Sequence, residues 1–289
     1  MPADRAQRFL FDATDIRGEC VHLQDAWSEV LAANPTVPGA HSLLGEFVAA
    51  SLLLAATIKF EGRLILQVRS EGEVPLLMAE ASHDKKVRAI VRVADGVERL
   101  SGDFATVFSG GTLAVTIENQ QGERYQSLVA LVGDSLAASL EGYFDQSEQL
   151  QTRISLAAND DVAAGMLLQQ LPRQLVTDEK QREIQWEHIT ILGDSLSREE
   201  LLTLDSQDIL GRLFVEDKVR LMGRDVIEFH CSCSAARTAQ SVMSLGEEQL
   251  ESLFEEQPSL HVDCEFCGAV YDFTRDSLVA TARGDHPSH

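Results

Sequence analysis

Four of the five cysteines in this 289-residue chain lie in two closely spaced pairs near the C-terminal end of the sequence. Cys231 and Cys233 form a C-x-C pair, and Cys264 and Cys267 form a C-x-x-C pair. Each pair can present two sulfur atoms from one tight turn, and four thiolates are a donor set that suits a tetrahedral zinc site. The spacing therefore predicts a zinc site with these four cysteines as ligands and one Zn²⁺ per chain in the reduced form.

Other roles for the residues around these pairs have weaker support from the local pattern. His230 and His261 each neighbour a cysteine pair and could ligate instead, but with four cysteines present they are better suited to tuning the thiolate charge. A thioredoxin-type active site needs its cysteine pair at the start of a helix, whereas Gly268 and a strand-like segment, 270–273, follow the C-x-x-C pair. The fifth cysteine, Cys20, is solitary, and we expect it to be a buried thiol that behaves as a small hydrophobe.

The composition is that of a globular protein with a strong acidic charge. Hydrophobic residues make up 44% of the chain, and 46 acidic against 24 basic side chains give a formal net charge of −22. Such a charge repels phosphate backbones, so we expect no binding to nucleic acid.

The most apolar run, from Leu43 to Ile58, contains Glu46 and is too short to cross a bilayer, so we expect a buried helix and no membrane partner. The first fifteen residues lack the apolar core of a secretory signal, which favours a cytoplasmic, reducing location.

Residues 1–176 combine helix-like and strand-like segments. The run from His41 to Lys59 predicts a long helix that is apolar on nearly all sides and therefore central to the core. From Arg63 onward the pattern changes to short strands, two of which, 113–118 and 125–132, flank a hairpin signal. These segments predict an α+β domain with a mainly antiparallel sheet and packed helices.

Residues 177–226 predict a helical linker that docks on this first domain. The segment is rich in charges, and Ser197 with Glu200 forms a capping box at a helix start. Its helices are too short to be stable alone and must pack on another surface. One of them carries a single apolar face, which is formed by Ile209, Leu210, Leu213 and Phe214.

The remaining residues, 227–289, form a small module that contains the two cysteine pairs. Between the pairs, Ser244 and Glu247 predict a second capping box at the start of a helix. That helix has one apolar stripe, formed by Leu250, Leu253 and Phe254. A module of about sixty residues with so thin a core usually needs a metal ion to stay folded. The predicted architecture is therefore an α+β domain, a helical linker and a C-terminal zinc-binding module.

Two copies of the tetrapeptide Gly-Asp-Ser-Leu raise the alternative of an esterase. Ser135 and Ser195 stand where a lipase and esterase family carries its nucleophile, but that family also needs an Asp-x-x-His near its C-terminus, and this sequence has none there. Ser and Asp before a helix are ordinary N-caps, so we expect these serines to cap helices and the chain not to be an enzyme. The sequence also lacks a phosphate-binding loop and the His-Glu-x-x-His motif of zinc proteases.

The whole chain resembles the heat shock protein 33 family, the redox-regulated 33 kDa chaperonins. The resemblance runs almost end to end and is most specific in the cysteine motifs, Phe229–Cys233 and Cys264–Gly268. The other matching segments are Leu43–Glu46, Lys59–Arg63, Tyr143–Gln149, Leu167–Pro172 and Leu213–Glu216. Val215 departs from the family pattern, in which histidine is common at this position.

The resemblance implies an ATP-independent holdase that is inactive when it is reduced and bound to zinc. Oxidation is then expected to form the disulfides Cys231–Cys233 and Cys264–Cys267, to release zinc, and to unfold the module and the linker. The oxidised protein would form a homodimer and protect thermally unfolding and oxidatively damaged client proteins from irreversible aggregation. The N-terminal domain and the exposed linker are expected to form the client surface.

Physical chemistry is compatible with such a stress-responsive switch. Zinc binding contributes on the order of 10–16 kcal/mol to small zinc modules, so its loss can unfold one outright. Undocked linker helices would expose the apolar face of Ile209, Leu210, Leu213 and Phe214 to clients. The alternative is a constitutive protein-binding module whose zinc is purely structural, which predicts that peroxide leaves the zinc in place.

Overall fold

The structure is a computed structural model that describes residues 4–283. The chain divides into two compact units, Met1–His230 and Cys231–His289. The larger unit contains two β-sheets and most of the helices, and the smaller unit contains the two cysteine pairs.

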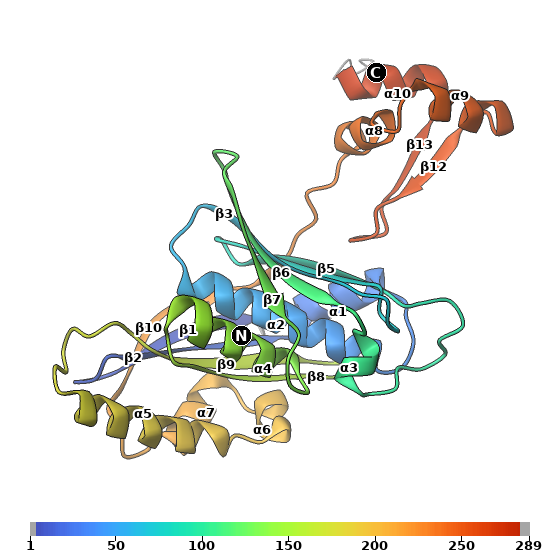
Figure 1. Ribbon diagram of the computed structural model, residues 1–289. Coiled ribbons are helices and arrows are strands. Elements are labelled where there is room, and N and C mark those ends of the chain that lie inside the picture. Colours follow the sequence, from blue (N-terminus) through green and yellow to red (C-terminus); the bar gives the residue numbers. More distant parts are fainter. Residues whose placement is uncertain (1–3, 284–289) are drawn as a thin grey trace. The chain divides into compact units, whose positions relative to one another are not determined.

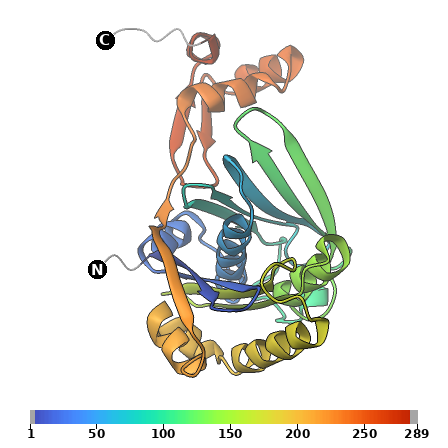
Figure 2. The ribbon, with the colours of Figure 1, turned by 90° about the vertical axis from the view of Figure 1, so that its left-hand side faces the viewer.

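The larger unit is built from two sheets that enclose one long helix (Figures 1 and 2). Among the described residues of this unit, all strand pairs are antiparallel except the short pairing of β11 with β5, which is parallel. The five-stranded sheet contains, in spatial order, β10 (Val219–Val226), β1 (Arg5–Phe11), β2 (Ile16–Leu23), β9 (Ala163–Gln170) and β8 (Thr152–Ala158). The six-stranded sheet contains β11 (Glu228–Phe229), β5 (Lys86–Arg92), β4 (Leu76–Ser82), β3 (Gly62–Arg69), β6 (Thr112–Asn119) and β7 (Arg124–Ala130). The predicted α+β class with mainly antiparallel pairing is confirmed.

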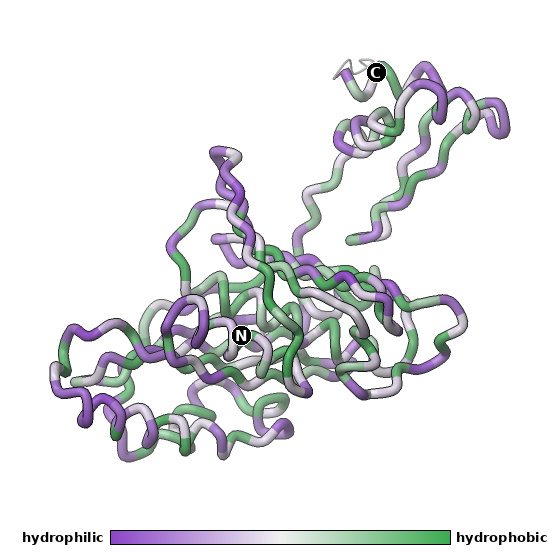
Figure 3. The backbone as a smooth tube through the Cα atoms, in the orientation of Figure 1, coloured by the Kyte–Doolittle hydropathy of each residue, from purple (hydrophilic) through white to green (hydrophobic). Residues whose placement is uncertain are grey.

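Helix α2 (Ala40–Thr57) lies between the two sheets and forms the centre of the core. Both sheets pack against it, which explains why its sequence is apolar nearly all round and why Figure 3 shows hydrophobic residues along its length. At 18 residues the helix is long and apolar enough to cross a membrane, which corrects the expectation that the run is too short, but 72% of it is buried inside the protein. At Gly45, an added Cβ would lie 2.4 Å from the Cβ of Ala158 in β8, so this close approach requires glycine. The apolar run is therefore a core helix, as the sequence predicts.

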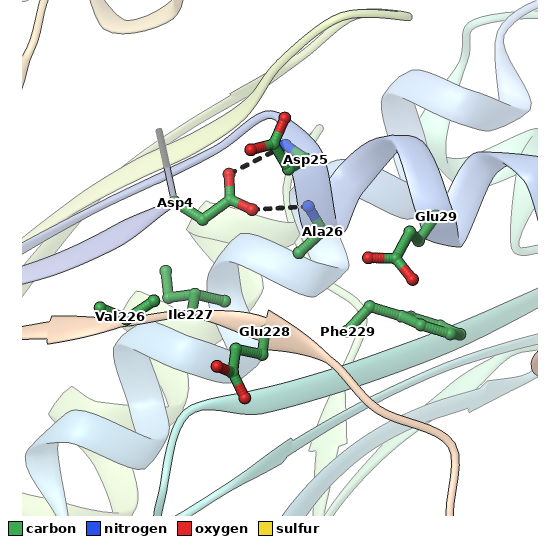
Figure 4. A pocket seen from close by; sticks show the side chains of 8 residues that line it. All are labelled: Asp4, Asp25, Ala26, Glu29, Val226, Ile227, Glu228 and Phe229. Atoms are coloured by element: carbon green, nitrogen blue, oxygen red, sulfur yellow. Dashed lines mark hydrogen bonds between the residues drawn. The ribbon is translucent and has the colours of Figure 1, made fainter. Parts of the chain in front are cut away.

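Shorter helices complete this core. They are α1 (Asp25–Ala33), α3 (Phe104–Val107) and α4 (Leu136–Tyr143), which continues into the π-helical turn η1 (Phe144–Glu148). Asp4 caps α1 from a distant point of the sequence, because its carboxylate accepts the backbone N–H groups of Asp25 at 3.0 Å and Ala26 at 2.5 Å (Figure 4). An open pocket of about 330 Å³ lies beside this cap, and Asp25, Glu29 and Glu228 make its lining acidic.

Three helices cover the outer face of the five-stranded sheet: α5 (Glu179–Asp194), α6 (Arg198–Thr203) and α7 (Ser206–Leu213) (Figures 1 and 2). The capping box predicted for α6 is present, since Ser197 and Glu200 each accept the backbone N–H of the other. The four apolar residues expected on one face near α7 are all buried, namely Ile209, Leu210, Leu213 and Phe214. They pack with outward side chains of the sheet, which include Phe9, Phe11, Ile16, Cys20, Met166 and Leu168.

The end of the segment 177–226 is a strand. Strand β10 pairs with β1 in a register that runs from Val219 opposite Phe11 to Val226 opposite Arg5. Seven of its eight residues are exposed, so no alternation of apolar and polar residues marks it as a strand. It forms because the free edge of β1 offers partners for its backbone N–H and C=O groups. Residues 219–226 are therefore extended and not helical, which corrects the helical expectation for this part of the linker.

Two sets of polar contacts connect the linker to the rest of the larger unit. Asp15 accepts three backbone N–H groups from residues 174–176 at 2.8–3.2 Å, and it pairs with Arg182 of α5 at 2.6 Å. Burial raises the pKa of Asp15, but these N–H groups and the Arg182 guanidinium outweigh it and hold the pKa below its usual range. Arg198, the first residue of α6, donates to Glu46 of α2 at 2.8 Å. Glu46, the charged residue within the apolar run of α2, thus binds the linker.

We expect Asp15→Asn to weaken the docking of α5 and to lower the free energy of unfolding by about 3 kcal/mol at neutral pH, because a buried guanidinium loses its counter-charge. The pKa of Asp15 is lower in the folded than in the unfolded protein. Its contribution is therefore present above the unfolded pKa of about 4 and is lost as the pH falls through the folded pKa, so wild type and variant should converge at low pH. Urea unfolding followed by circular dichroism at several pH values measures both effects.

Asp178→Asn provides the matched control, because Asp178 is the exposed N-cap of the same helix. Its substitution should destabilise the protein by about 1 kcal/mol or less. Equal losses in the two variants would show that Asp15 is not a special anchor.

Candidate metal centre

The smaller unit consists of a β-hairpin and three helices around a small apolar cluster. Its elements are α8 (Ala235–Met243), α9 (Glu247–Glu256), β12 (Leu260–Asp263), β13 (Val270–Phe273) and α10 (Arg275–Arg283). Among the described residues, the cluster has four buried members: Ala239, Leu250, Phe273 and Leu278. So small a core is insufficient to fix a unit of this length, which leaves the cysteines as its main cross-connection.

The C-x-x-C pair lies on the turn that joins β12 to β13. The backbone N–H groups of Cys267 and Gly268 both donate to the carbonyl oxygen of Cys264, at 3.2 and 2.7 Å. Gly268 has a φ of +68°, a left-handed conformation that glycine adopts without strain. The turn therefore presents two sulfur atoms on a closely defined backbone.

The C-x-C pair lies in the segment directly before α8. Ser234 caps this helix by accepting the backbone N–H of Arg237 at 3.3 Å. The Arg237 guanidinium in turn donates to the carbonyl oxygen of Ser232 at 2.7 Å. This return contact fixes the backbone between Cys231 and Cys233.

The four sulfur atoms lie together, all within 4.8 Å of one another. The Sγ atoms of Cys231 and Cys264 are 3.6 Å apart, and those of Cys233 and Cys267 are 3.3 Å apart. Four sulfur atoms at about 2.3 Å from a tetrahedral zinc ion would be about 3.8 Å from one another. The cluster fits this geometry after shifts of at most about 1 Å. The four predicted ligands are therefore placed to hold one metal ion.

The thiols of the cluster differ in acidity. Burial raises the pKa of Cys233, but hydrogen bonds from Tyr271 and the neighbouring cysteines outweigh it and lower the value to about 7. Burial and hydrogen bonds with the other three cysteines raise the pKa of Cys267 to about 12, and burial also raises the pKa of Cys264. The cluster can therefore hold one negative charge, but further deprotonation of its thiols is unfavourable because like charges would crowd in a small volume. A bound cation would remove this opposition, since thiols that coordinate a metal are deprotonated.

The other candidate residues are not members of the group of four sulfur atoms. The ring of His261 contacts the carboxylate of Asp272 on the exposed side of the hairpin, and His230 belongs to the larger unit. Cys20 also belongs to the larger unit, where it is 2% exposed beneath α5–α7. Burial raises the pKa of this thiol, as expected for an inert, hydrophobe-like cysteine.

The two serines of the repeated tetrapeptide form hydrogen bonds at the ends of helices. Ser135 caps α4 by accepting the backbone N–H of Ala138 at 3.1 Å, as predicted. Ser195 lies at the C-terminal end of α5, where its hydroxyl donates to the carbonyl oxygen of Leu192 at 2.7 Å, so the N-cap prediction is wrong for this residue. Within residues 4–283, neither hydroxyl forms a hydrogen bond with a histidine.

Sequence reasoning missed Tyr271 and misplaced one helix start. The Tyr271 hydroxyl donates to the Cys233 Sγ at 3.1 Å, and the only signal for this residue was its place on the predicted strand after the C-x-x-C pair. Helix α9 begins after Gly246, not at the capping box predicted from Ser244. Helix α8 extends to Met243, so Ser244 ends α8, and its hydroxyl donates to the last turn of that helix.

Comparisons with known proteins agree over nearly the full length. A model of the family described as "Hsp33 protein" matches residues 4–274. A 33 kDa chaperonin of Pseudomonas aeruginosa is 46% identical over 283 residues, which cover 98% of this chain and 95% of that protein. A 33 kDa chaperonin of Pseudomonas syringae pv. tomato is 44% identical over 289 residues, with 99% and 96% covered. The crystal structure of the 33 kDa chaperonin from Thermotoga maritima shares the fold, with a TM-score of 0.81 at 20% identity and 98% of both chains covered.

We expect that replacing any one of the four clustered cysteines by serine will reduce zinc affinity by more than about a hundredfold, since loss of a ligand should exceed the effect of changing a supporting residue. Metal analysis combined with competition against a chelator measures this change. Cys20→Ala is the control and should retain one zinc ion per chain. A Cys233→Ser variant that binds zinc as tightly as the wild type would contradict the assignment.

Proposed function

The chain belongs to the Hsp33 family, and on this premise we propose that it is a redox-regulated, ATP-independent chaperone of the holdase type. One observation carries the proposal: a cluster of four thiols joins the parts of a unit whose apolar core is very small. With Zn²⁺ bound to the reduced thiols, the unit would stay folded and the chaperone would be inactive. Its clients would be thermally unfolding and oxidatively damaged cytoplasmic proteins.

Oxidation by peroxide would convert the four thiolates into two disulfides. A first thiolate sulfur attacks one peroxide oxygen, the O–O bond breaks, and a sulfenic acid and a hydroxide ion form. A second thiolate then displaces hydroxide from the sulfenic sulfur and completes the S–S bond. Two peroxide molecules thus accept four electrons from four thiolates and yield two disulfides and four hydroxide ions. No thiolate then remains to hold the metal.

We propose that the disulfides form within each motif, as Cys231–Cys233 and Cys264–Cys267. The family resemblance supports this pairing. The shortest sulfur contacts of the reduced cluster instead join the two motifs, so proximity alone does not select the partners. A disulfide between residues as close in sequence as Cys231 and Cys233 would be strained and therefore readily reduced, which suits a reversible switch.

The linker is the segment that oxidation would release. Strand β11 pairs with β5 through Glu228 and Phe229, and the first cysteine follows two residues later. A change at Cys231 therefore acts directly on the short strand that ends the larger unit. We propose that the linker helices, once this end is loosened, undock from the five-stranded sheet.

Undocking would expose two complementary apolar surfaces. One is the linker face of Ile209, Leu210, Leu213 and Phe214, and the other is the outer face of the sheet. The ring of Phe214 now lies edge-on to Phe11, with 4.8 Å between ring centroids. Contiguous apolar surfaces of this kind bind other proteins, so we propose that they capture clients and favour the oxidised homodimer.

The activity is tested by light scattering from a thermally unfolding client protein. We expect peroxide-treated protein to suppress aggregation and the reduced, zinc-loaded protein to suppress little. A colorimetric chelator should detect one zinc ion released per chain on the same time course. Zinc that stays in place, with unchanged helix content and equal suppression in both states, would instead identify a constitutive binding module with structural zinc.

Cys20 offers an internal probe of linker docking, because it lies on the sheet face that α5–α7 cover. We expect a maleimide reagent to label Cys20 more than about tenfold faster after oxidation, since undocking removes the cover while the other four thiols are held in disulfides. Mass spectrometry of the labelled peptides locates the reaction. Cys20→Ala serves as the control, and equally slow labelling of Cys20 before and after oxidation would rule out undocking.

A further inference from the structure

Tyr271 makes a direct contact with one sulfur of the cluster. Its hydroxyl donates a hydrogen bond to the Cys233 Sγ at 3.1 Å. Tyr271 lies on β13 opposite Val262 of β12, whereas Cys233 lies in the segment before α8. The contact therefore joins the hairpin to the other cysteine pair by a bond that does not involve the metal.

The tyrosine ring is held in place independently of its hydroxyl. It packs against the apolar cluster of the smaller unit and stacks with Phe273, with 6.5 Å between ring centroids and 15° between ring planes. Tyr271 and Phe273 alternate with the exposed Asp272, so both rings lie on the same face of the hairpin. Removal of the hydroxyl alone would leave this packing intact.

A hydrogen bond to a thiolate sulfur reduces its reactivity toward an oxidant. The bond stabilises the charge on sulfur and occupies a lone pair that the sulfur would use in attack. Backbone N–H groups of Phe266 and Ala269 act in this way on Cys264 and Cys267. Cys233 receives such a bond from a side chain, which a single substitution can remove.

We propose that Tyr271 is a positioning residue that protects Cys233 and so sets the oxidant concentration at which the metal centre opens. The inference rests on the proposed function, because it concerns the regulation of the same four thiols. Without the hydroxyl, the Cys233 sulfur would attack a peroxide oxygen more readily, with hydroxide as the leaving group and a sulfenic acid as the product. A second thiolate of the cluster would then displace hydroxide from this sulfenic acid and form the disulfide.

Tyr271→Phe in the full-length, zinc-loaded protein tests the proposal. The second-order rate constant of peroxide-driven zinc release, followed with a chelator, should rise about fivefold, the factor that corresponds to one net hydrogen bond. Release without peroxide and helix content by circular dichroism should be unchanged. Tyr125→Phe, which removes a hydroxyl from a 60% exposed tyrosine of the larger unit, should leave both rates as in the wild type.

A second measurement does not depend on oxidation. Iodoacetamide treatment of the zinc-loaded protein, mapped by mass spectrometry, should modify Cys233 about fivefold faster in the variant while Cys264 and Cys267 react at the wild-type rate. Equal rates at Cys233 would overturn the proposal, as would zinc release that accelerates equally without peroxide, because that result indicates lost packing. If the wild type keeps its zinc in peroxide, the proposed function fails, and the alkylation rates decide the role of Tyr271.

Discussion

Four thiolates within 4.8 Å of one another repel, and a cation is needed to balance their charge. The same four residues connect the segment before α8 to the hairpin of β12 and β13. Under the proposed function, charge balance at the sulfur atoms would therefore also determine whether this unit stays folded. Its apolar cluster, with four buried members among the described residues, is too small to take over that role. In the proposed switch, chemistry at sulfur and the folding of the unit would thus be one event.

The larger unit has the opposite balance, because its apolar core is built around α2, which is enclosed by two sheets. The linker helices are intermediate between the two units in how far they depend on apolar packing. Their apolar faces dock on the sheet, and the pairs Asp15–Arg182 and Glu46–Arg198 fix where they dock. Charged groups recover their hydration when such pairs open, and only Asp15–Arg182 is fully buried, so the two pairs define a contact more than they stabilise it.

The sequence was sufficient for features that depend on residue type and short spacing. These include the four clustered cysteines, the long apolar helix α2 and the capping box at Ser197. It was insufficient where the partner is remote. Strand β10 depends on the edge of β1, and the contact of Tyr271 with Cys233 depends on how the hairpin packs against the segment before α8. Ser195 and Ser244 have the composition of N-caps but end helices, because local sequence did not show where the preceding helix stops.

Strand β10 is held to its sheet by backbone hydrogen bonds, and seven of its eight residues are exposed. Segments with so little buried side-chain area belong to the part of a protein that opens at the lowest free energy. Once β10 opens, β1 becomes the edge of the sheet and presents a row of unpaired N–H and C=O groups. An extended peptide can add to such an edge through its main chain, whatever its side chains are. Strand β10, which ends the linker, thus also covers an edge that can pair with the backbone of an extended peptide of any sequence.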